Sequence, residues 1–341
     1  MQLPHTLLNR RLLPLALGLA LVLASAASAT AQSAQSARLG ALYRDAARMP
    51  LLTSLLVAQQ GRLLREQYFH GLRPDQPVNI KSASKSILSA LVGIAIAEGE
   101  FGEQSRISDL LPDYFRDIRD PARRALTVRQ LLTMQTGLAG TSFDNYGDWV
   151  NSRNWVRYAL HQPFVCQPDT CMQYSTGNSH ILSVVLTRQT GMSTRSYAQR
   201  KLFTPLGMRL RGWARDPQGF DFGGNEMFLT PRDMLKFGEL YRRGGKHNGK
   251  QLLPATWISK SWGEYTTSPY NGHRYGYHWW TREHQGTKLH FAWGYGGQFI
   301  FVVPAKQLVV VATSSINRGR NGGHLRAVHD LVDRIIETVP R

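Results

Sequence analysis

The chain has 341 residues, of which 42% are hydrophobic and 19% are charged. This composition is that of a globular protein with room for a substantial core, and it excludes a disordered chain. The formal net charge is +18. The Lys and Arg residues are nevertheless scattered, without a basic helix, zinc-finger spacing or ribonucleoprotein motif, so we expect no nucleic-acid partner.

Residues 1–31 have the pattern of an export signal. Arg10 and Arg11 form a basic start, an apolar run follows, and small residues lead to a cleavage pattern that ends at Ala29 or Ala31. The apolar run is short for a membrane span, so we expect cleavage and no stable membrane span afterwards. The mature protein would be periplasmic or secreted, with anionic cell-wall polymers as candidate partners for its positive surface.

The first elements predicted in the mature chain are a short helix over residues 36–48 and a β-hairpin. The hairpin has strands over residues 55–61 and 63–69 with a turn between them. A helix then starts at Ser82 and ends before Gly99, with apolar residues at helical spacing. It has so few polar residues that we expect it to be buried on most sides.

Ser82 stands where this helix begins, and two roles fit it. As an N-cap it would stabilise the helix, but a capping box requires Glu or Gln three residues later, and that residue is Lys85. A cation there faces the positive end of the helix dipole, at a cost of about 0.3–1 kcal/mol. As a nucleophile, Ser82 would share a helix face with a buried, neutral Lys85 that accepts its proton. This motif alone leaves both roles open.

Residues 103–135 have a helical, polar-faced pattern, and Thr127 is suited to cap a helix within it. Residues 143–161 are rich in Trp, Tyr and Arg. These side chains either line a groove or pack as ordinary large aromatics.

Cys166 and Cys171 are the two cysteines of the chain. In an oxidising compartment their spacing favours a local disulfide, with free thiols as the alternative. A metal site needs more ligands, and none is nearby. His180, His273 and His278 form no ligand motif, so we expect surface or packing roles for them and no metal.

Tyr174 lies just before a second apolar helix, predicted over residues 180–190. It is either an ordinary buried tyrosine or a phenol that exchanges a proton with a lysine-activated serine. In the second case the loop between the cysteines would hold it in place. Further on, Thr230 and Pro231 mark the start of another helix.

From Tyr275 the sequence changes to short strands separated by turns, which favours antiparallel pairing. The strands are predicted over residues 275–281, 288–293, 298–303 and 308–314, and an amphipathic helix over residues 323–338. Strands near both chain ends with helices between them indicate an α+β fold. We expect a sheet part from residues 36–95 and 225–341 and a helical insertion over residues 96–224. Glycines before the strand at residue 298 either let a substrate approach or form a tight turn.

The order of Ser82-x-x-Lys85, then Tyr174, then a Gly-rich strand start resembles the serine β-lactamase and penicillin-recognising superfamily. Over residues 45–340 the chain is most similar to its class C β-lactamase-like branch, which includes esterases, D-amino-acid peptidases and 6-aminohexanoate-dimer hydrolases. The similarity to 6-aminohexanoate-dimer hydrolases rests on four further stretches, residues 130–138, 174–178, 229–234 and 276–280.

The resemblance implies a β-lactamase-like/transpeptidase fold, with an antiparallel sheet flanked by N- and C-terminal helices and an inserted helical domain. It implies that Ser82 is the acyl-accepting nucleophile, Lys85 the base and Tyr174 the proton relay. The backbone N–H groups of Ser82 and of a residue near Gly297 and Gln298 would form the oxyanion hole. Asn178, Tyr295 and Gly296 are further candidates for substrate binding. No metal or organic cofactor is implied.

The sequence departs from the branch at two places. The branch has Tyr-x-Asn where this chain has Thr176, with Asn178 two residues later. The Lys-Thr-Gly strand motif is replaced by Tyr295-Gly296-Gly297, which lacks the cation that would hold a β-lactam carboxylate. We therefore expect an exported serine hydrolase acting on an ester, small amide or peptide. The alternatives are a cell-wall D-amino-acid peptidase or weak β-lactamase, and a penicilloylated or ligand-holding sensor without turnover.

Overall fold

The computed structural model describes residues 33–316 and 322–340, and an eight-stranded antiparallel sheet forms its centre. The predicted export signal lies outside the described residues. The strand order is β2-β1-β13-β12-β11-β10-β9-β8. The bounds are Leu52–Gln59 (β1), Arg62–Tyr68 (β2), Thr266–Thr267 (β8), Arg274–Tyr275 (β9), Trp280–His284 (β10), Thr287–Gly294 (β11), Gln298–Val303 (β12) and Leu308–Ser314 (β13). Because β1 pairs with β13, strands from near both chain ends lie side by side in the sheet.

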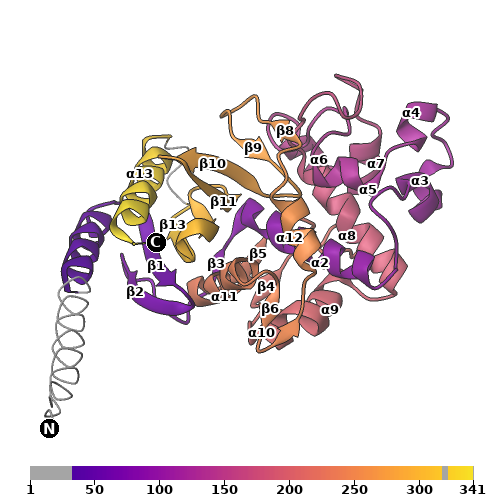
Figure 1. Ribbon diagram of the computed structural model, residues 1–341. Helices are drawn as coiled ribbons and strands as arrows, with labels where there is room; N and C mark the ends of the chain where they lie inside the picture. The colour runs from indigo at the N-terminus through magenta and orange to yellow at the C-terminus, as the bar shows by residue number, and fades with distance from the viewer. Residues whose placement is uncertain (1–32, 317–321, 341) are drawn as a thin grey trace, which may run out of the picture.

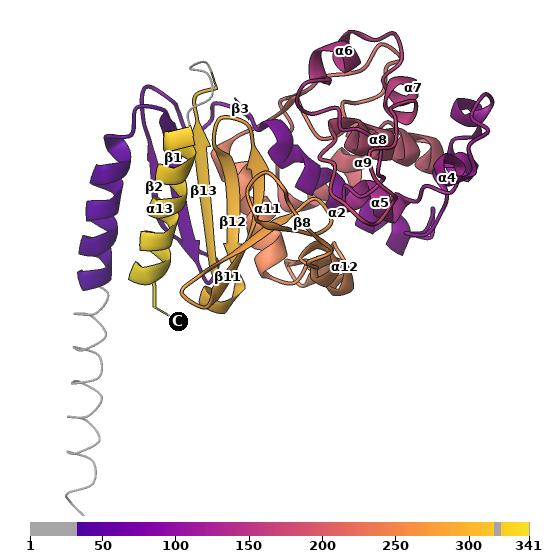
Figure 2. The same cartoon turned by 90° about the horizontal axis from the view of Figure 1, so that it is seen from above.

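Both faces of the sheet are covered, which explains the unbroken apolar runs of β12 and β13. Phe301 points to the face covered by α13 (Gly322–Thr338) and by the helix over residues 33–47. Its neighbour Ile300 points to the opposite face, which α11 (Pro231–Arg242) covers. Alternate side chains of a strand point to opposite faces, so a strand buried on both sides must be apolar throughout. Figures 1 and 2 show this three-layer arrangement.

A helical part lies beside the sheet, around α2 (Ser84–Ala97) and α8 (Thr176–Thr190), which pack against each other (Figure 1). The shorter helices are α3 (Ile107–Leu110), α4 (Pro121–Arg124), α5 (Val128–Leu132), α6 (Tyr146–Asn151), α7 (Trp155–Leu160), α9 (Thr194–Ala198), α10 (Thr204–Leu206) and α12 (Ala255–Ser261). A small sheet of order β3-β5-β4 has strands Val78–Asn79, Met227–Leu229 and Gly212–Trp213, and β6 (Lys246–His247) pairs with β7 (Lys250–Gln251). The predicted boundaries of the helical insertion stay predictions.

Several local predictions are confirmed because they depend on short-range geometry. The first hairpin forms, and α2 ends before Gly99. Thr127 closes a capping box with Gln130 at the start of α5. Thr230 caps α11, whose first residue is Pro231.

The prediction of a helical stretch over residues 103–135 is wrong in its extent. This stretch contains α3, a 3₁₀ turn at Pro112–Phe115, α4 and α5, separated by turns. Pro112 and Pro121 each start a new short element, because proline lacks the backbone N–H that a continuing helix needs.

The strand predicted over residues 275–281 is wrong in its middle. Residues 276–279 leave the sheet between β9 and β10. The backbone N–H of Gly276 donates to the carbonyl oxygen of Trp279 (2.8 Å), and a Cβ at Gly276 would lie only 2.1 Å from the carbonyl oxygen of Ser261. The excursion brings His278 against α2, where its Nδ1 lies 3.1 Å from the carbonyl oxygen of Lys85.

The helix predicted over residues 180–190 begins four residues earlier, at Thr176. Its first backbone N–H groups are satisfied by a loop far back in the chain. The N–H of Thr176 donates to Ser142 Oγ (2.7 Å), and the N–H of Gly177 donates to Thr141 Oγ1 (2.8 Å). Such capping by remote side chains stabilises a helix start that has no signal in its own sequence.

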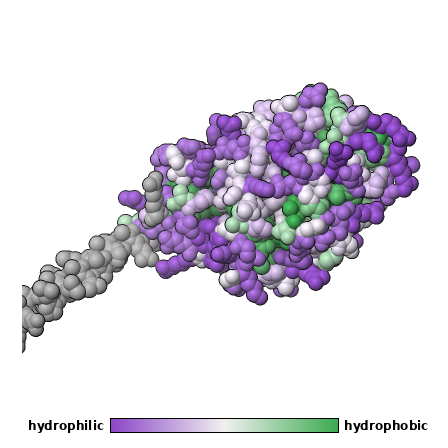
Figure 3. All heavy atoms as spheres, turned by 45° about the vertical axis from the view of Figure 1, so that its right-hand side comes forward, coloured by the Kyte–Doolittle hydropathy of each residue, from purple (hydrophilic) through white to green (hydrophobic). Residues whose placement is uncertain are grey.

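Hydrophilic side chains cover most of the face seen in Figure 3, and hydrophobic ones form patches between them. Within residues 33–316 and 322–340, each helix is too short or too polar to cross a bilayer.

Candidate active site

Ser82 lies in a short 3₁₀ turn, η1 (Lys81–Ala83), between β3 and α2. The prediction that the long helix begins at Ser82 is therefore wrong by two residues. The N-cap position of α2 is Ala83, and no side chain makes a capping hydrogen bond there. Lys81 has a φ of 51°, and its backbone N–H donates to Asn79 Oδ1 (3.0 Å). The structure thus places Ser82 beside the helix start without making it the cap.

The side chains of Ser82, Lys85 and Tyr174 meet at this turn. Lys85 Nζ lies 3.1 Å from Ser82 Oγ, and the Tyr174 phenol is near enough to the Ser82 side chain for Ser82 to oppose part of the rise in the phenol's pKa. Lys85 Nζ also lies 5.2 Å from the centre of the Tyr174 ring. The short spacing from η1 into the first turn of α2 sets the distance between Ser82 and Lys85, and the contact between α2 and the start of α8 adds Tyr174.

Lys85 is buried among neutral groups. Its Nζ lies 3.1 Å from Thr176 Oγ1 and 2.8 Å from the carbonyl oxygen of Gly224. Burial lowers the pKa of Lys85 to about 7, because water that would solvate the ammonium is excluded. Burial and the charge of Lys85 lower the pKa of the neighbouring His278 to about 3, so this imidazole is neutral. A neutral amine is therefore accessible near pH 7.

Tyr174 is buried as well, and burial raises its pKa to about 12, against a smaller opposing effect of the Ser82 hydrogen bond. Its resting form near neutral pH is the phenol, which can donate a proton. The site thus pairs a group that can accept a proton, Lys85, with one that can donate it, Tyr174.

The polar residue next to this group is Thr176, and the predicted part of Asn178 in substrate binding stays a prediction. Asn178 is buried two residues further along α8, where its amide donates to Thr136 Oγ1 (3.3 Å). It does not line the cavity. Thr176 contacts Lys85 directly and lies 2.7 Å from Ser142 Oγ. Thr176 stands where the branch's Tyr-x-Asn motif has its asparagine, so the position in the motif is the signal that could have pointed to Thr176.

The predicted Gly-rich turn lies against the other side of Ser82. A Cβ at Gly294 would lie 2.1 Å from the carbonyl oxygen of Ile80, so this glycine permits the strand to approach η1. Tyr295 and Gly296 line the cavity. Gly297 and Gln298 do not: the N–H of Gly297 donates to the carbonyl oxygen of Gly294, and the Gln298 amide donates to that of Ser314 (2.7 Å).

The cavity that contains Ser82 has a volume of about 770 Å³ and a mostly apolar wall. Its aromatic residues are Phe143, Tyr146, Tyr174, Tyr270, Trp280, Trp293 and Tyr295. Phe143, Tyr270 and Tyr295 are about half exposed, so they lie where the cavity opens to solvent. The two alternatives for residues 143–161 are both realised, because Phe143 and Tyr146 line the cavity while Trp149 and Trp155 pack in the core.

The sequence profile of the beta-lactamase family matches residues 51–333. The chain belongs to the beta-lactamase family. Members of this family are generally serine hydrolases of the β-lactamase-like superfamily, and the resemblance described above is confirmed. The α+β fold is confirmed as well.

Two curated relatives and one solved structure illustrate the family. The chain is 22% identical to 6-aminohexanoate-dimer hydrolase of Paenarthrobacter ureafaciens over 77% of this chain and 72% of that protein. It is 27% identical to Esterase EstB of Burkholderia gladioli over 54% of this chain and 53% of that protein. A class C beta lactamase from Rhodobacter sphaeroides has the same fold, with a TM-score of 0.65, 17% identity, and coverage of 89% of this chain and 99% of that one.

Other features of this family member lie near the site. Cys166 and Cys171 are joined by a disulfide, which closes the loop that precedes Tyr174. The site residues that sequence analysis missed are Ser142, Thr176 and Gly224, which contribute a hydroxyl, a second hydroxyl and a carbonyl oxygen. In the part of the chain that the structure describes, no three His, Cys, Asp or Glu side chains are grouped so as to hold a metal ion.

Proposed function

We propose that this protein hydrolyses an ester or a small amide through an acyl-enzyme at Ser82, with water as the usual acceptor. The observation that carries the proposal is the contact of Ser82 Oγ with both Lys85 Nζ and the Tyr174 phenol, in a site where burial lowers the pKa of Lys85 to about 7. A serine hydroxyl is a weak nucleophile until a nearby base removes its proton.

In acylation, neutral Lys85 accepts the proton of Ser82 while Oγ attacks the carbonyl carbon of the substrate. The carbonyl oxygen then carries negative charge, which backbone N–H groups at the Ser82 turn and near the Gly-rich turn would stabilise. When the bond to the leaving group breaks, the Tyr174 phenol donates a proton to the departing alcohol or amine. The ammonium of Lys85 then passes its proton to the Tyr174 phenolate, so both residues return to their starting protonation states.

In deacylation, a water molecule takes the place of the departed group. Lys85 with Tyr174 removes a proton from this water, whose oxygen attacks the acyl carbon. The bond to Ser82 Oγ breaks, and Oγ regains its proton. The products are the free acid and the resting site.

The cavity favours neutral, apolar substrates because its wall is mostly apolar. Its lysine, Lys81, is already paired with Glu226 at 2.6 Å. A β-lactam carboxylate would find no cation at Tyr295, the position that aligns with the lysine of the branch's motif. We therefore propose ester or amide hydrolysis of the kind named for the relatives above, before β-lactam or D-peptide hydrolysis.

We also propose that the protein is exported and acts outside the cytoplasm. The basic and apolar pattern of residues 1–31 supports this, and the disulfide between Cys166 and Cys171 is suited to an oxidising compartment. Cleavage is tested by the N-terminal sequence of the protein recovered from the periplasm or the medium.

The test labels the protein with a fluorophosphonate and maps the adduct by mass spectrometry, beside turnover assays. The substrates are p-nitrophenyl esters of increasing acyl length, a D-alanyl muropeptide and a penicillin. We expect labelling at Ser82 and steady turnover of the esters, with both absent in Ser82→Ala. An adduct at another residue, turnover by Ser82→Ala, or burst labelling without turnover would overturn the proposal, the last in favour of a sensor.

A further inference from the structure

We propose that His180 is a positioning residue for Lys85, acting through the backbone of Gly223 and Gly224. The inference rests on the proposed function, since it concerns how the base of that reaction is held. His180 lies outside the cavity and cannot touch a substrate there.

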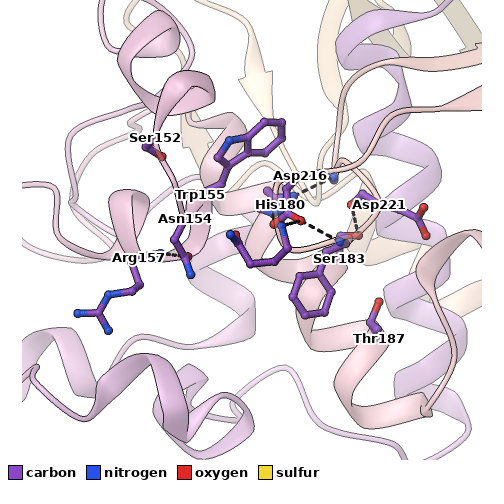
Figure 4. Close-up of polar contacts among 12 residues, drawn as sticks. Ser152, Asn154, Trp155, Arg157, His180, Ser183, Thr187, Asp216 and Asp221 are labelled. Carbon is purple, nitrogen blue, oxygen red and sulfur yellow. Dashed lines mark hydrogen bonds and ion pairs between the residues drawn. The ribbon is translucent and has the colours of Figure 1, made fainter.

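His180 and Asp216 form a pair (Figure 4), and both side chains are fully buried. His180 Nε2 lies 3.0 Å from Asp216 Oδ2. On the other side of the ring, Nδ1 accepts the backbone N–H of Gly223 (3.3 Å). Because Nδ1 is an acceptor, the proton of the neutral imidazole is on Nε2 and is donated to the carboxylate. The aspartate therefore selects the tautomer that can hold Gly223.

The glycine pair transmits this contact to the active site. A Cβ at Gly223 would lie 2.3 Å from the carbonyl oxygen of Ser179, so the backbone is pressed against α8. Gly224 has a φ of +80°, and a Cβ there would lie 2.6 Å from Lys85 Cγ. Its carbonyl oxygen makes the shortest hydrogen bond of Lys85 Nζ, at 2.8 Å.

The carbonyl of Gly224 decides which way the lone pair of Lys85 points. A neutral amine has two N–H bonds and one lone pair. A carbonyl oxygen can only accept, so the Gly224 oxygen fixes one N–H, and Thr176 Oγ1 can accept the other. The lone pair is then left for the proton of Ser82. If the Gly224 carbonyl moves, the amine of Lys85 can rotate. Its lone pair then faces Ser82 for only part of the time, and Lys85 acts less often as the base.

A purely structural role for His180 is the competing explanation, because the ring also packs against aromatic side chains. Its centre lies 5.2 Å from that of Trp155 and 6.1 Å from that of Phe222. The two explanations differ in one respect. Packing depends on the size of the side chain, whereas positioning depends on an acceptor toward Gly223.

The experiment compares His180→Asn with His180→Gln. The Asn carbonyl can replace Nδ1 as acceptor for Gly223, whereas the Gln amide reaches the Asp216 side and leaves Gly223 without its acceptor. We expect the Gln variant to lose about 10–100-fold in kcat with KM unchanged. We expect the Asn variant to stay within about fivefold of the wild type in kcat, although it leaves the buried Asp216 Oδ2 without its partner and so lowers the melting temperature. Equal activities of the two variants would overturn the inference.

Asp216→Asn is the second variant, chosen because it is isosteric and decides the matter even if the His180 variants do not fold. Its carbonyl can still accept the N–H groups of Gln218 and Phe220, which bind Asp216 Oδ1 at 2.9 and 2.8 Å. Its NH₂ then faces His180 and moves the proton to Nδ1, opposite the N–H of Gly223. We expect a loss of kcat of about 10–100-fold without a change in KM. A wild-type kcat would overturn the inference.

Failure of this inference is distinguishable from failure of the proposed function. If Ser82→Ala abolishes turnover while the Asn and Gln variants are equal, Lys85 is held without help from His180. If Ser82→Ala still turns over, the proposed function itself is wrong.

Discussion

Ser82 has a lysine on each side in the sequence, and the two lie in opposite surroundings. The Lys81 side chain is partly exposed, and its Nζ lies 2.6 Å from Glu226 Oε1. The other carboxylate oxygen of Glu226, Oε2, accepts a hydrogen bond from the side-chain amide of Asn79 (2.6 Å). Lys85 Nζ is buried and contacts two hydroxyls and a carbonyl oxygen, which are all neutral. Both amines belong to the same five-residue segment, residues 81–85, which contains Ser82.

The difference shows that environment assigns the chemistry to one lysine. A carboxylate partner stabilises the charged ammonium, whereas burial without a counter-charge favours the neutral amine. Lys81 is therefore held as part of an ion pair in the cavity wall, and Lys85 is available as a base. The following experiments test this contrast, from the largest expected effect to the smallest.

Lys85→Ala removes the base, and we expect the rate of fluorophosphonate labelling at Ser82 to fall by about 10³-fold. Lys81→Ala is the matched control, because it removes an amine of the same length next to the same serine. We expect that variant to stay within about tenfold of the wild type, since an ion pair in the wall transfers no proton. Wild-type labelling by Lys85→Ala would contradict the role of Lys85.

Tyr174→Phe removes the proton donor but keeps the ring that packs against Trp280. We expect ester turnover to fall by about 10²-fold with an unchanged melting temperature. Tyr270→Phe, at the mouth of the same cavity, is the control and should retain most activity. Equal losses in the two variants would show that the phenol of Tyr174 has no special part.

The pH profile of kcat/KM should follow the protonation of Lys85. Burial lowers the pKa of this amine to about 7, and below that pH the protonated form cannot accept the Ser82 proton. We therefore expect kcat/KM to fall by about tenfold per pH unit below pH 7 and to level off above pH 8. Circular dichroism over the same range separates this limb from acid unfolding. A flat profile between pH 5 and pH 8 would contradict the assignment.

Thr176→Asp breaks the contrast by giving Lys85 a carboxylate at the place of Thr176 Oγ1, 3.1 Å from Nζ. An opposite charge this close should raise the pKa of Lys85 by about one unit or more, which lowers kcat/KM at pH 7 by about tenfold. Activity should recover toward pH 9. Thr176→Asn supplies a neutral group of similar size, and its acid limb should stay in place; equal shifts in both variants would refute the explanation.

Glu226→Gln removes the partner of Lys81 and should have the smallest effect. The pair is partly exposed, so we expect a loss of about 0–1 kcal/mol in the free energy of unfolding. Turnover of a neutral ester should change by less than about threefold, because neither side chain transfers a proton. Urea unfolding measures the change in the free energy of unfolding, and ester kinetics measure the change in turnover. A large loss of kcat would mean that the wall lysine takes part in the reaction.

The sequence was informative wherever the structure depends on neighbours along the chain. Ser82 and Lys85 are one helical turn apart, so their contact follows from helix geometry alone. The cap at Thr230 and the capping box at Thr127 follow from the residues beside them. The order of Ser82, Lys85, Tyr174 and the Gly-rich strand start, together with the four further stretches, indicated the family.

Predictions failed where distant segments decide the outcome. Thr176 reaches Lys85 across 91 residues, and Gly224 reaches it across 139. The early start of α8 depends on Ser142, 34 residues before it. Asn178 has the residue type of the branch's motif, but it lies two residues further along α8, where its amide donates to Thr136.

The amino-acid sequence by itself determined the α+β class and the spacing of Ser82 and its lysine, because periodicity and caps act over one or two helical turns. Only the tertiary structure decided that Lys85 is enclosed by neutral oxygen atoms while Lys81 meets a carboxylate. A pKa depends on which groups surround the amine and on how much water reaches it, and these are properties of packing between segments far apart in the chain.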